Sequence, residues 1–269
     1  MAFDVLLELV NVLSVLATAA LVILTIKPCR ASGIPYLLAI PAGFGLMTVA
    51  FAVQALQPFL VSGSPLLGSP VEAVWLLIET YGVLFLAFAY ARRTRLRLLG
   101  ESTLADLLVA ALVTLVFLVV IFVSMAFGAV DAAPTNGEFF LRAVIVSATI
   151  YLVYETLRNW KLTQKASQGI VTISFALVLV AQVGFILALG NLGSVATFLA
   201  YEGRLMFLFL FNSVLLVGVK KNDPVAVMRR LGLGAPAHSR PPFSRNSKHR
   251  FSVLSRESQR TPGHQRSTR

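Results

Sequence analysis

A single glutamate, Glu79, lies near the middle of an apolar run at residues 71–91. The run is long enough for a helix to cross a membrane, where an ionisable side chain costs about 2.5–3.5 kcal/mol. At helical spacing Glu79 shares a face with Glu72, and Tyr81 lies beside it. One interpretation is a protonatable carboxylate in a ligand or ion pathway. The other is a buried glutamic acid that hydrogen-bonds Gln182 or a tyrosine and only fixes the helix register.

A second polar group begins the last apolar run, at Tyr201-Glu202-Gly203-Arg204. Arg204 is long enough to extend toward the membrane surface. Together with Glu72 and Gln54, Glu202 and Arg204 are candidates for the lining of a vestibule that opens outward. Equally, Glu202 and Arg204 form part of a charge pair between helices, which would be purely structural.

Glu155 and Arg158 form a third polar group, at the end of the fifth apolar run. Their i,i+3 spacing on a helix allows them to pair. The structural interpretation is a locally neutralised pair at the membrane interface. The functional alternative is a gate or a docking point for a partner. Arg142, at the other end of this run, is expected to reach the membrane surface.

Chemistry that other seven-span proteins depend on is missing from the apolar runs. The three histidines all follow residue 237, Cys29 is the single cysteine, and every lysine lies at or beyond the edge of a run. Metal sites and intramembrane proteases need histidine, cysteine or paired aspartate ligands, and a retinal protein needs a lysine in its last span. We therefore expect no metal, no cofactor such as retinal, and no enzymatic activity.

The composition places these residues in a membrane. Apolar residues make up 57% of the 269-residue chain and charged residues 13%, with a mean hydropathy of +0.80. A soluble domain carries roughly a quarter charged residues, because its surface must be hydrated. The composition excludes a soluble enzyme or a soluble nucleic-acid-binding domain. It predicts an all-α integral membrane protein, with the lipid bilayer around it and the cell membrane as its location.

Seven apolar runs are long enough to cross a bilayer, and proline, glycine or basic residues separate them. The sequence thus predicts a seven-transmembrane-helix bundle in residues 1–221. The expected spans are 4–26, 34–57, 71–91, 103–128, 138–159, 168–190 and 196–219.

Lysine and arginine are concentrated in every second loop of this bundle. They follow the first, third, fifth and seventh spans, whereas the loops at 58–70, 129–137 and 191–195 contain none. Cytoplasmic loops carry an excess of these residues in membrane proteins. The pattern predicts that the N-terminus is outside and that the C-terminus is cytoplasmic.

Weak internal similarity suggests a repeat. Ser-Gly-Ile at 32–34 opens the second span and Gln-Gly-Ile at 168–170 opens the sixth. This would suit a parallel 3+1+3 arrangement, in which the fourth span joins two three-helix units; chance similarity between apolar helices is the alternative. Within the second span, Pro41 is expected to kink the helix, and Gly43 and Gly45 to permit close packing.

The basic charge of the chain lies almost entirely at its C-terminal end. Residues 220–269 carry a net charge of +10, whereas residues 1–219 carry +1. Residues 222–234 predict an interfacial amphipathic helix, and residues 235–269 predict a disordered basic cytoplasmic tail. Basic side chains near an anionic leaflet contribute about 1 kcal/mol each. The expected partners are anionic lipid head groups or a cytoplasmic protein, and no specific nucleic acid is expected.

Two function classes fit these features best. The first is a membrane sensor or adaptor that has an outward site near Glu72 and Glu202 and a basic tail as its cytoplasmic readout. The second is a small-solute or proton-coupled transporter that uses Glu79 as the titrating group. A non-catalytic subunit of a larger membrane complex would explain a largely apolar interior equally well. The sequence favours the sensor or adaptor.

Overall fold

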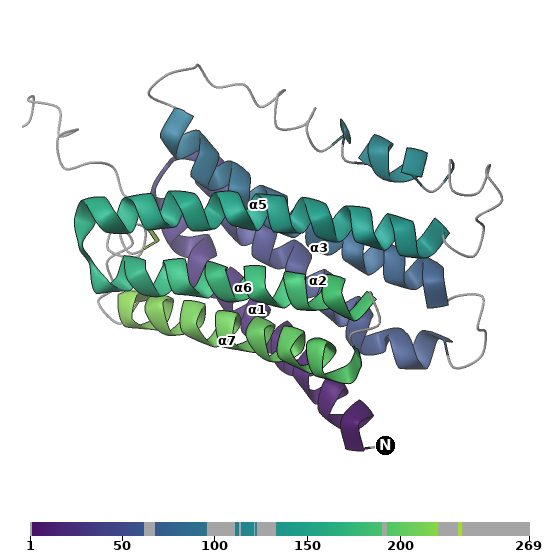
Figure 1. Cartoon of the computed structure of the whole chain (residues 1–269). Helices are drawn as coiled ribbons and strands as arrows, with labels where there is room; N and C mark the ends of the chain where they lie inside the picture. Colours follow the sequence, from purple (N-terminus) through teal and green to yellow (C-terminus); the bar gives the residue numbers. More distant parts are fainter. Residues whose placement is uncertain are drawn as a thin grey trace, which may run out of the picture. The chain divides into compact units, whose positions relative to one another are not determined.

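The computed structural model describes residues 2–61, 68–95, 111–112, 114–120, 122, 133–189, 193–219 and 231–232. Within these residues the long elements are all α-helices (Figure 1). They are α1 (Ala2–Ala31), α2 (Ala39–Val61), α3 (Gly68–Arg95), α5 (Ala133–Thr163), α6 (Ala166–Leu189) and α7 (Gly193–Val219), with a short 3₁₀ helix, η1 (Pro35–Leu38), before α2.

Six of these helices are long and apolar enough to cross a membrane. The spanning segments are Glu8–Ala31, Pro35–Phe59, Val71–Arg92, Asn136–Thr163, Ala166–Ala188 and Ala196–Val217. The all-helical architecture and the membrane-spanning helices agree with the sequence prediction. The predicted fourth span, 103–128, lies largely outside the described residues, and its described part is helical.

Large apolar side chains face outward from the bundle. Leu16, Ile23, Ile150, Val180 and Phe209 are each more than half exposed. Exposed apolar surface on this scale is unfavourable in water, whereas the hydrocarbon of a bilayer accommodates it. The outer surface therefore supports a membrane environment independently of helix length.

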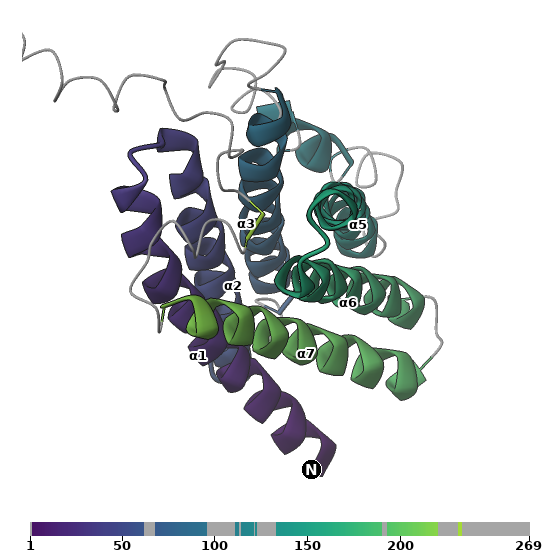
Figure 2. The same cartoon turned by 90° about the vertical axis from the view of Figure 1, so that its left-hand side faces the viewer.

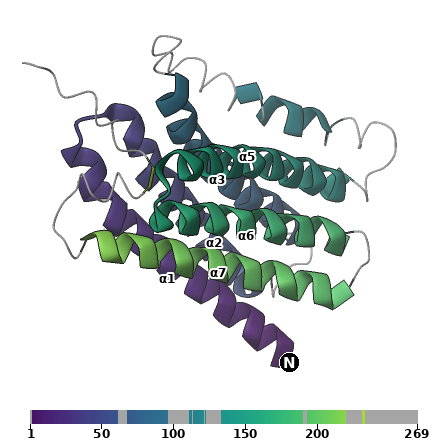
Figure 3. The same cartoon turned by 60° about the vertical axis from the view of Figure 1, so that its left-hand side comes forward.

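The six helices pack in a closed ring, in which each helix contacts its neighbours in chain order and α7 contacts α1. α1 packs against α2, α2 against α3, α3 against α5, α5 against α6, α6 against α7, and α7 against α1. Figures 1 and 3 show α5, α6 and α7 side by side, and Figure 2 views α5 nearly end-on. A closed ring gives all six helices an inward face.

Two of the neighbouring pairs run in parallel. Asn11 and Ala17 of α1 contact Arg204 and Asn212 of α7 in the same order along the chain. α3 and α5 likewise start at the same end of the bundle (Figure 1), where Arg142 lies over the ring of Trp75. α3 therefore finishes at the opposite end of the bundle from the one where α5 begins.

Glycine allows α2 and α3 to approach closely. A Cβ atom built on Gly43 would lie 2.7 Å from the carbonyl oxygen of Gly82, and one on Gly82 would lie 2.7 Å from Cγ of Met47. Gly45 has no such neighbour within 4 Å. The prediction of close packing is therefore confirmed at Gly43 and wrong at Gly45.

Pro41 does not kink a continuous helix, contrary to the sequence prediction. η1 ends at Leu38, α2 begins at Ala39, and Pro41 lies in the first turn of α2. The missing N–H of a proline costs little in a first turn, because that donor has no intrahelical acceptor. The 3₁₀ helix η1 leads directly into α2, since Ala39 has a right-handed helical conformation.

Aromatic rings fill the half of the bundle where α2 and α6 begin. Phe44 and Phe175 each pack edge-on against Phe211, and Tyr90 packs edge-on against Phe175 with 5.9 Å between ring centroids. Phe207 is also fully buried in this group. These rings separate the polar side chains of the other half from the end of the bundle where α3 and α7 finish.

Candidate functional site: a buried polar cluster between the helices

Arg204 lies at the centre of a cluster of polar side chains that all six helices supply. It is the ninth residue of its spanning segment, about 12 Å along the helix from its start. Its Nη1 donates to Oε1 of Gln54 on α2 at 2.8 Å, and its Nη2 donates to Oδ1 of Asn11 on α1 at 2.7 Å. The guanidinium is 4% exposed. The expectation that Arg204 extends toward the membrane surface is wrong, because these amides hold it inside the bundle.

Aromatic rings cover the faces of the Arg204 guanidinium. Its Cζ lies 4.4 Å from the ring centroid of Phe51 and 4.7 Å from that of Tyr201. Gln54 also donates from Nε2 to the Tyr201 hydroxyl at 2.9 Å, which fixes that ring. A desolvated cation over an aromatic face is stabilised by about 2 kcal/mol. In the described part of the chain, no carboxylate lies within ion-pair distance of Arg204.

Glu79 enters the same cluster from α3. It is 3% exposed, and its Oε1 accepts a hydrogen bond of 3.0 Å from Nε2 of Gln182 on α6. This is the contact with Gln182 that the sequence analysis considered for a buried glutamate. The Glu79 carboxylate also interacts electrostatically with both Arg204 and Arg142.

Arg142 of α5 completes the buried charges. Its Nη2 pairs with Oε1 of Glu138 at 2.7 Å, and its Nη1 donates to Oε1 of Gln182 at 3.4 Å. Its Cζ lies 4.4 Å from the ring centroid of Phe185. Arg142 was expected to reach the membrane surface; instead it is 4% exposed, because Glu138, Gln182 and Phe185 supply its partners within the bundle.

The other candidates at this end of the bundle lie outside the hydrogen-bonded core. Glu72 is half-buried and interacts electrostatically with Glu138 and Arg142. Glu202 is half-buried and makes none of the hydrogen bonds or ion pairs found in this cluster. Tyr81 points away from Glu79, and its hydroxyl hydrogen-bonds the hydroxyl of Thr114. The structure therefore brings Glu79, Gln182 and Arg204 together but leaves Glu202 and Tyr81 outside.

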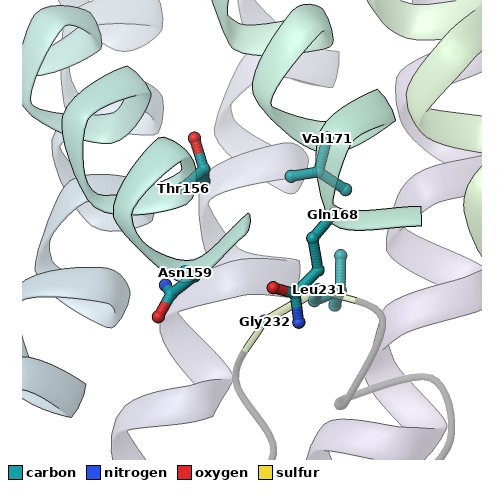
Figure 4. Close-up of a pocket in the computed structure, with 6 residues that line it drawn as sticks. All are labelled: Thr156, Asn159, Gln168, Val171, Leu231 and Gly232. Atoms are coloured by element: carbon teal, nitrogen blue, oxygen red, sulfur yellow. The ribbon is translucent and has the colours of Figure 1, made fainter. Parts of the chain in front are cut away.

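A second group of polar residues occupies the opposite end of the bundle. Glu155 and Arg158 are 4.0 Å apart, and the Arg158 side chain is 54% exposed. Near them the Tyr90 hydroxyl donates to the carbonyl oxygen of Leu231 at 2.9 Å. A shallow pocket beside this contact is lined by Thr156, Asn159, Gln168, Val171, Leu231 and Gly232 (Figure 4).

Leu231 and Gly232 are the described residues of the predicted interfacial helix at 222–234. They form a turn in which Gly232 has a φ of +74°, and Leu231 is buried in the main hydrophobic core. The other residues of that segment and the predicted tail at 235–269 lie outside the described residues. The chain after α7 therefore contacts α3 at the end of the bundle remote from Arg204.

Three members of the cluster were not singled out from the sequence: Asn11, Glu138 and Trp75. A fourth member, Arg142, was predicted to reach the membrane surface. One signal in the sequence could have found the arginines. Arg142 and Arg204 are the two cations among residues 1–219 that do not lie at the basic ends of the first, third and fifth spans. The positive-inside bias leaves them unexplained.

The described residues contain no group of three histidine, cysteine, aspartate or glutamate side chains that could hold a metal ion. No protein-family model matches this chain, and comparisons with curated proteins and with solved structures found no match either. The geometry of the polar cluster is therefore the basis for a proposed function. Its central feature is that Arg204 and Glu79 are each held by a neutral glutamine rather than by each other.

Proposed function

We propose that this protein is a non-catalytic membrane sensor, in which the polar cluster responds to a small polar solute and α3 transmits the response to residues 220–269. The observation that carries the proposal is the double role of α3. Glu79 of α3 lies in the cluster, and Tyr90 of α3 holds the carbonyl of Leu231. Glu79 and Tyr90 are eleven positions apart, which is three helical turns or about 16 Å, so both side chains lie on nearly the same face of the helix.

A displacement of α3 at the cluster would reach Leu231 because the helix moves as one body. Gly43 and Gly82 fit α3 closely against α2, and Tyr90 packs on Phe175 of α6. Packed interfaces of this kind have discrete arrangements rather than a continuous range. A solute that binds one arrangement more tightly shifts the population toward it.

We further propose seven spans in the cell membrane, with the N-terminus outside and the C-terminus cytoplasmic. The basic residues after α1, α3 and α5 support this orientation. The parallel packing of α3 and α5 supports a further span within residues 96–132. In this orientation the polar cluster lies in the outer half of the bilayer. Leu231 lies at the cytoplasmic end, where the basic segment would meet anionic lipid head groups or a cytoplasmic protein.

The sensor is tested by measuring access to position 231. In a Cys29→Ser background, Leu231→Cys places the single thiol at the contact with Tyr90, and its rate of maleimide labelling is measured in proteoliposomes. We expect Tyr90→Phe to increase the basal rate several-fold, because the hydrogen bond to the Leu231 carbonyl is lost. A responsive solute, sought among formate, phosphate, ammonium and glycine, changes the rate in the native cluster but not with Glu79→Gln.

Tyr154→Phe is the matched control, because Tyr154 is 60% exposed on α5. It should leave the labelling rate unchanged. The sensor proposal is wrong if the rate at position 231 is the same with every solute and with both Glu79→Gln and Arg204→Gln, in protein that remains folded.

A proton-coupled carrier is the second candidate, and a matched placement of residues favours it. Glu79 and Arg204 are each the ninth residue of their spanning segments. Each hydrogen-bonds a glutamine across the bundle: Glu79 bonds Gln182 of α6, and Arg204 bonds Gln54 of α2. A parallel repeat that relates α1–α3 to α5–α7 would produce this correspondence. Two related halves around a central polar site are typical of transporters.

Flux in proteoliposomes loaded with a pH-sensitive dye tests the carrier. Solute-dependent proton movement that disappears with Glu79→Gln supports it. Absence of flux with folded native protein, in vesicles where position 231 responds to the same solute, favours the sensor.

A further inference from the structure

Two buried N–H donors in the polar cluster have no acceptor among the described residues. They are Nε of Arg204 and Nε1 of the Trp75 indole. Both side chains are almost fully buried, at 4% and 3% exposure. A buried donor without an acceptor costs about 1–3 kcal/mol, and more when the group is charged. Both donors therefore lack an acceptor in the part of the chain that the structure describes.

The surroundings of Arg204 leave one N–H donor of its guanidinium, Nε, without an acceptor among the described residues. The rings of Phe51 and Tyr201 pack against its Cζ, and Gln54 and Asn11 accept hydrogen bonds from its terminal nitrogens. Nε and Nη2 form one edge of the planar guanidinium. This edge matches the two oxygens of a carboxylate in a bidentate arrangement.

Charge balance requires that a proton accompany an anion bound to Arg204. Arg142 is paired with Glu138, whereas Arg204 and Glu79 are held by neutral amides. An anion on Arg204 would bring one negative charge into the cluster. A proton on Glu79 would remove one, so the two together leave the net charge unchanged.

We propose that the cluster binds a small organic carboxylate at the Nε edge of Arg204, and that Glu79 takes up a proton as the anion binds. The carboxylate accepts hydrogen bonds from Nε and Nη2, and no covalent bond is made or broken. The inference rests on the proposed function only in treating the cluster as the ligand site.

Several groups besides the ligand act on the Glu79 carboxyl. Gln182 donates to it from α6, and Trp75 lies one turn before it on α3. The titratable or charged groups around it are Glu72 of α3, Glu138 and Arg142 of α5, and Tyr201 and Arg204 of α7. Arg204 carries the charge that the anion would neutralise.

Trp75, which packs against Arg142 in the same cluster, provides a fluorescence readout of binding. The chain has two tryptophans, and Trp160 lies at the opposite end of the bundle, against Gly169. Trp160→Phe therefore leaves the fluorescence of Trp75 as the single indole signal. The full-length protein in lipid nanodiscs is titrated with sodium formate at constant ionic strength, at pH 5.5 and pH 7.5. Formate remains ionised at both values, so a pH effect reports on the protein.

We expect a saturable change in Trp75 fluorescence, with several-fold tighter binding at pH 5.5 than at pH 7.5. Glu79→Gln should remove the pH dependence while formate still binds. Arg204→Lys keeps the charge but lacks the planar edge and should weaken binding at least tenfold. Arg158→Lys, at the other end of the bundle, should behave as the native protein.

Three results would overturn the inference. The first is the absence of a saturable fluorescence change up to roughly 100 mM formate in folded protein, a range that would saturate a site with a Kd near 1 mM. The second is an equal response to chloride. The third is undiminished formate binding with Arg204→Lys. The sensor function and the formate site can each be disproved independently of the other. If formate binds but labelling at position 231 does not respond, the sensor is wrong and this site remains. If position 231 responds to another solute and formate does not bind, the sensor remains and this site is wrong.

Discussion

At the scale of single residues, the two buried arginines are stabilised by different partners. Arg142 is neutralised by Glu138, whereas Arg204 is held by Asn11 and Gln54 and covered by aromatic rings. Insertion of an arginine at mid-membrane costs about 2.5–3.5 kcal/mol, and each site offsets this with several contacts. The first arrangement is complete without a ligand, whereas the second leaves Nε without an acceptor.

Removal of the carboxylate partner of Arg142 should destabilise the protein. Glu138→Gln leaves Arg142 buried with amides only, and we expect a loss of about 1–2 kcal/mol, because the Glu138 side chain keeps some exposure. The measurement is the midpoint of thermal unfolding in detergent. Arg158→Gln is the control: its pair with Glu155 is long and its side chain is 54% exposed, so the change should stay below about 0.5 kcal/mol. Equal effects of the two changes would contradict this assignment.

Helix rotation explains why Arg142 and Arg204 were misplaced from sequence. Both lie within reach of a membrane surface by their position along the helix, and a long side chain can extend there. Whether it does depends on which helix face meets Asn11, Gln54 or Gln182, residues that are 40 to 193 positions away. Glu79 was easier to place, because its position near mid-span excludes the surface as a destination.

At the scale of elements, hydropathy alone predicted six helices that the structure contains, but it predicted the positions of their ends less accurately. α5 runs from Ala133 to Thr163, beyond the predicted 138–159, because polar residues at both ends continue the helix outside the apolar run. At the start of α2 the sequence suggested one kinked helix, whereas η1 precedes a separate α2. Apolar periodicity reports the part of a helix in the bilayer, not the turns that extend it.

The close contact between α2 and α3 gives a prediction with a matched control. Gly43→Ala would place a methyl group 2.7 Å from the Gly82 carbonyl oxygen, so the helices must separate, and we expect a loss of about 1–3 kcal/mol. Gly45→Ala meets nothing within 4 Å and should be neutral or slightly stabilising, because alanine favours the helix. Thermal unfolding of both variants measures the difference. Similar losses would show that the contact is not close in the native protein.

At the scale of the whole molecule, the chain divides into two units, residues 1–234 and 235–269. The first unit includes Leu231, which is buried in the core and bonded to Tyr90. A chain that ends after Gly234 should therefore unfold at the same temperature as the full chain. A chain that ends after Asn222 should unfold at a lower temperature, since it lacks Leu231. If both truncations have the same stability, the Leu231 contact contributes nothing to the fold.

The proposed orientation predicts which end of α5 is accessible from outside the cell. In a Cys29→Ser background, Asn136→Cys and Lys161→Cys place single thiols at exposed positions near the two ends of this helix. A membrane-impermeant maleimide added to intact cells should label position 136 and should label position 161 only after the cells are opened. The reverse pattern would invert the topology and place the polar cluster in the inner half of the bilayer.

The long separation between Arg204 and its partners affects how the protein is made. Gln54 and Asn11 precede Arg204 by 150 and 193 residues, and at about 5–20 residues per second the ribosome needs roughly 10–40 s to reach it. During that interval the two amides are already in the membrane without the guanidinium. α7 then brings a buried cation whose partners lie on α1 and α2. The insertion machinery must therefore keep α1 and α2 accessible until α7 has been made, so biogenesis of this bundle depends on α7.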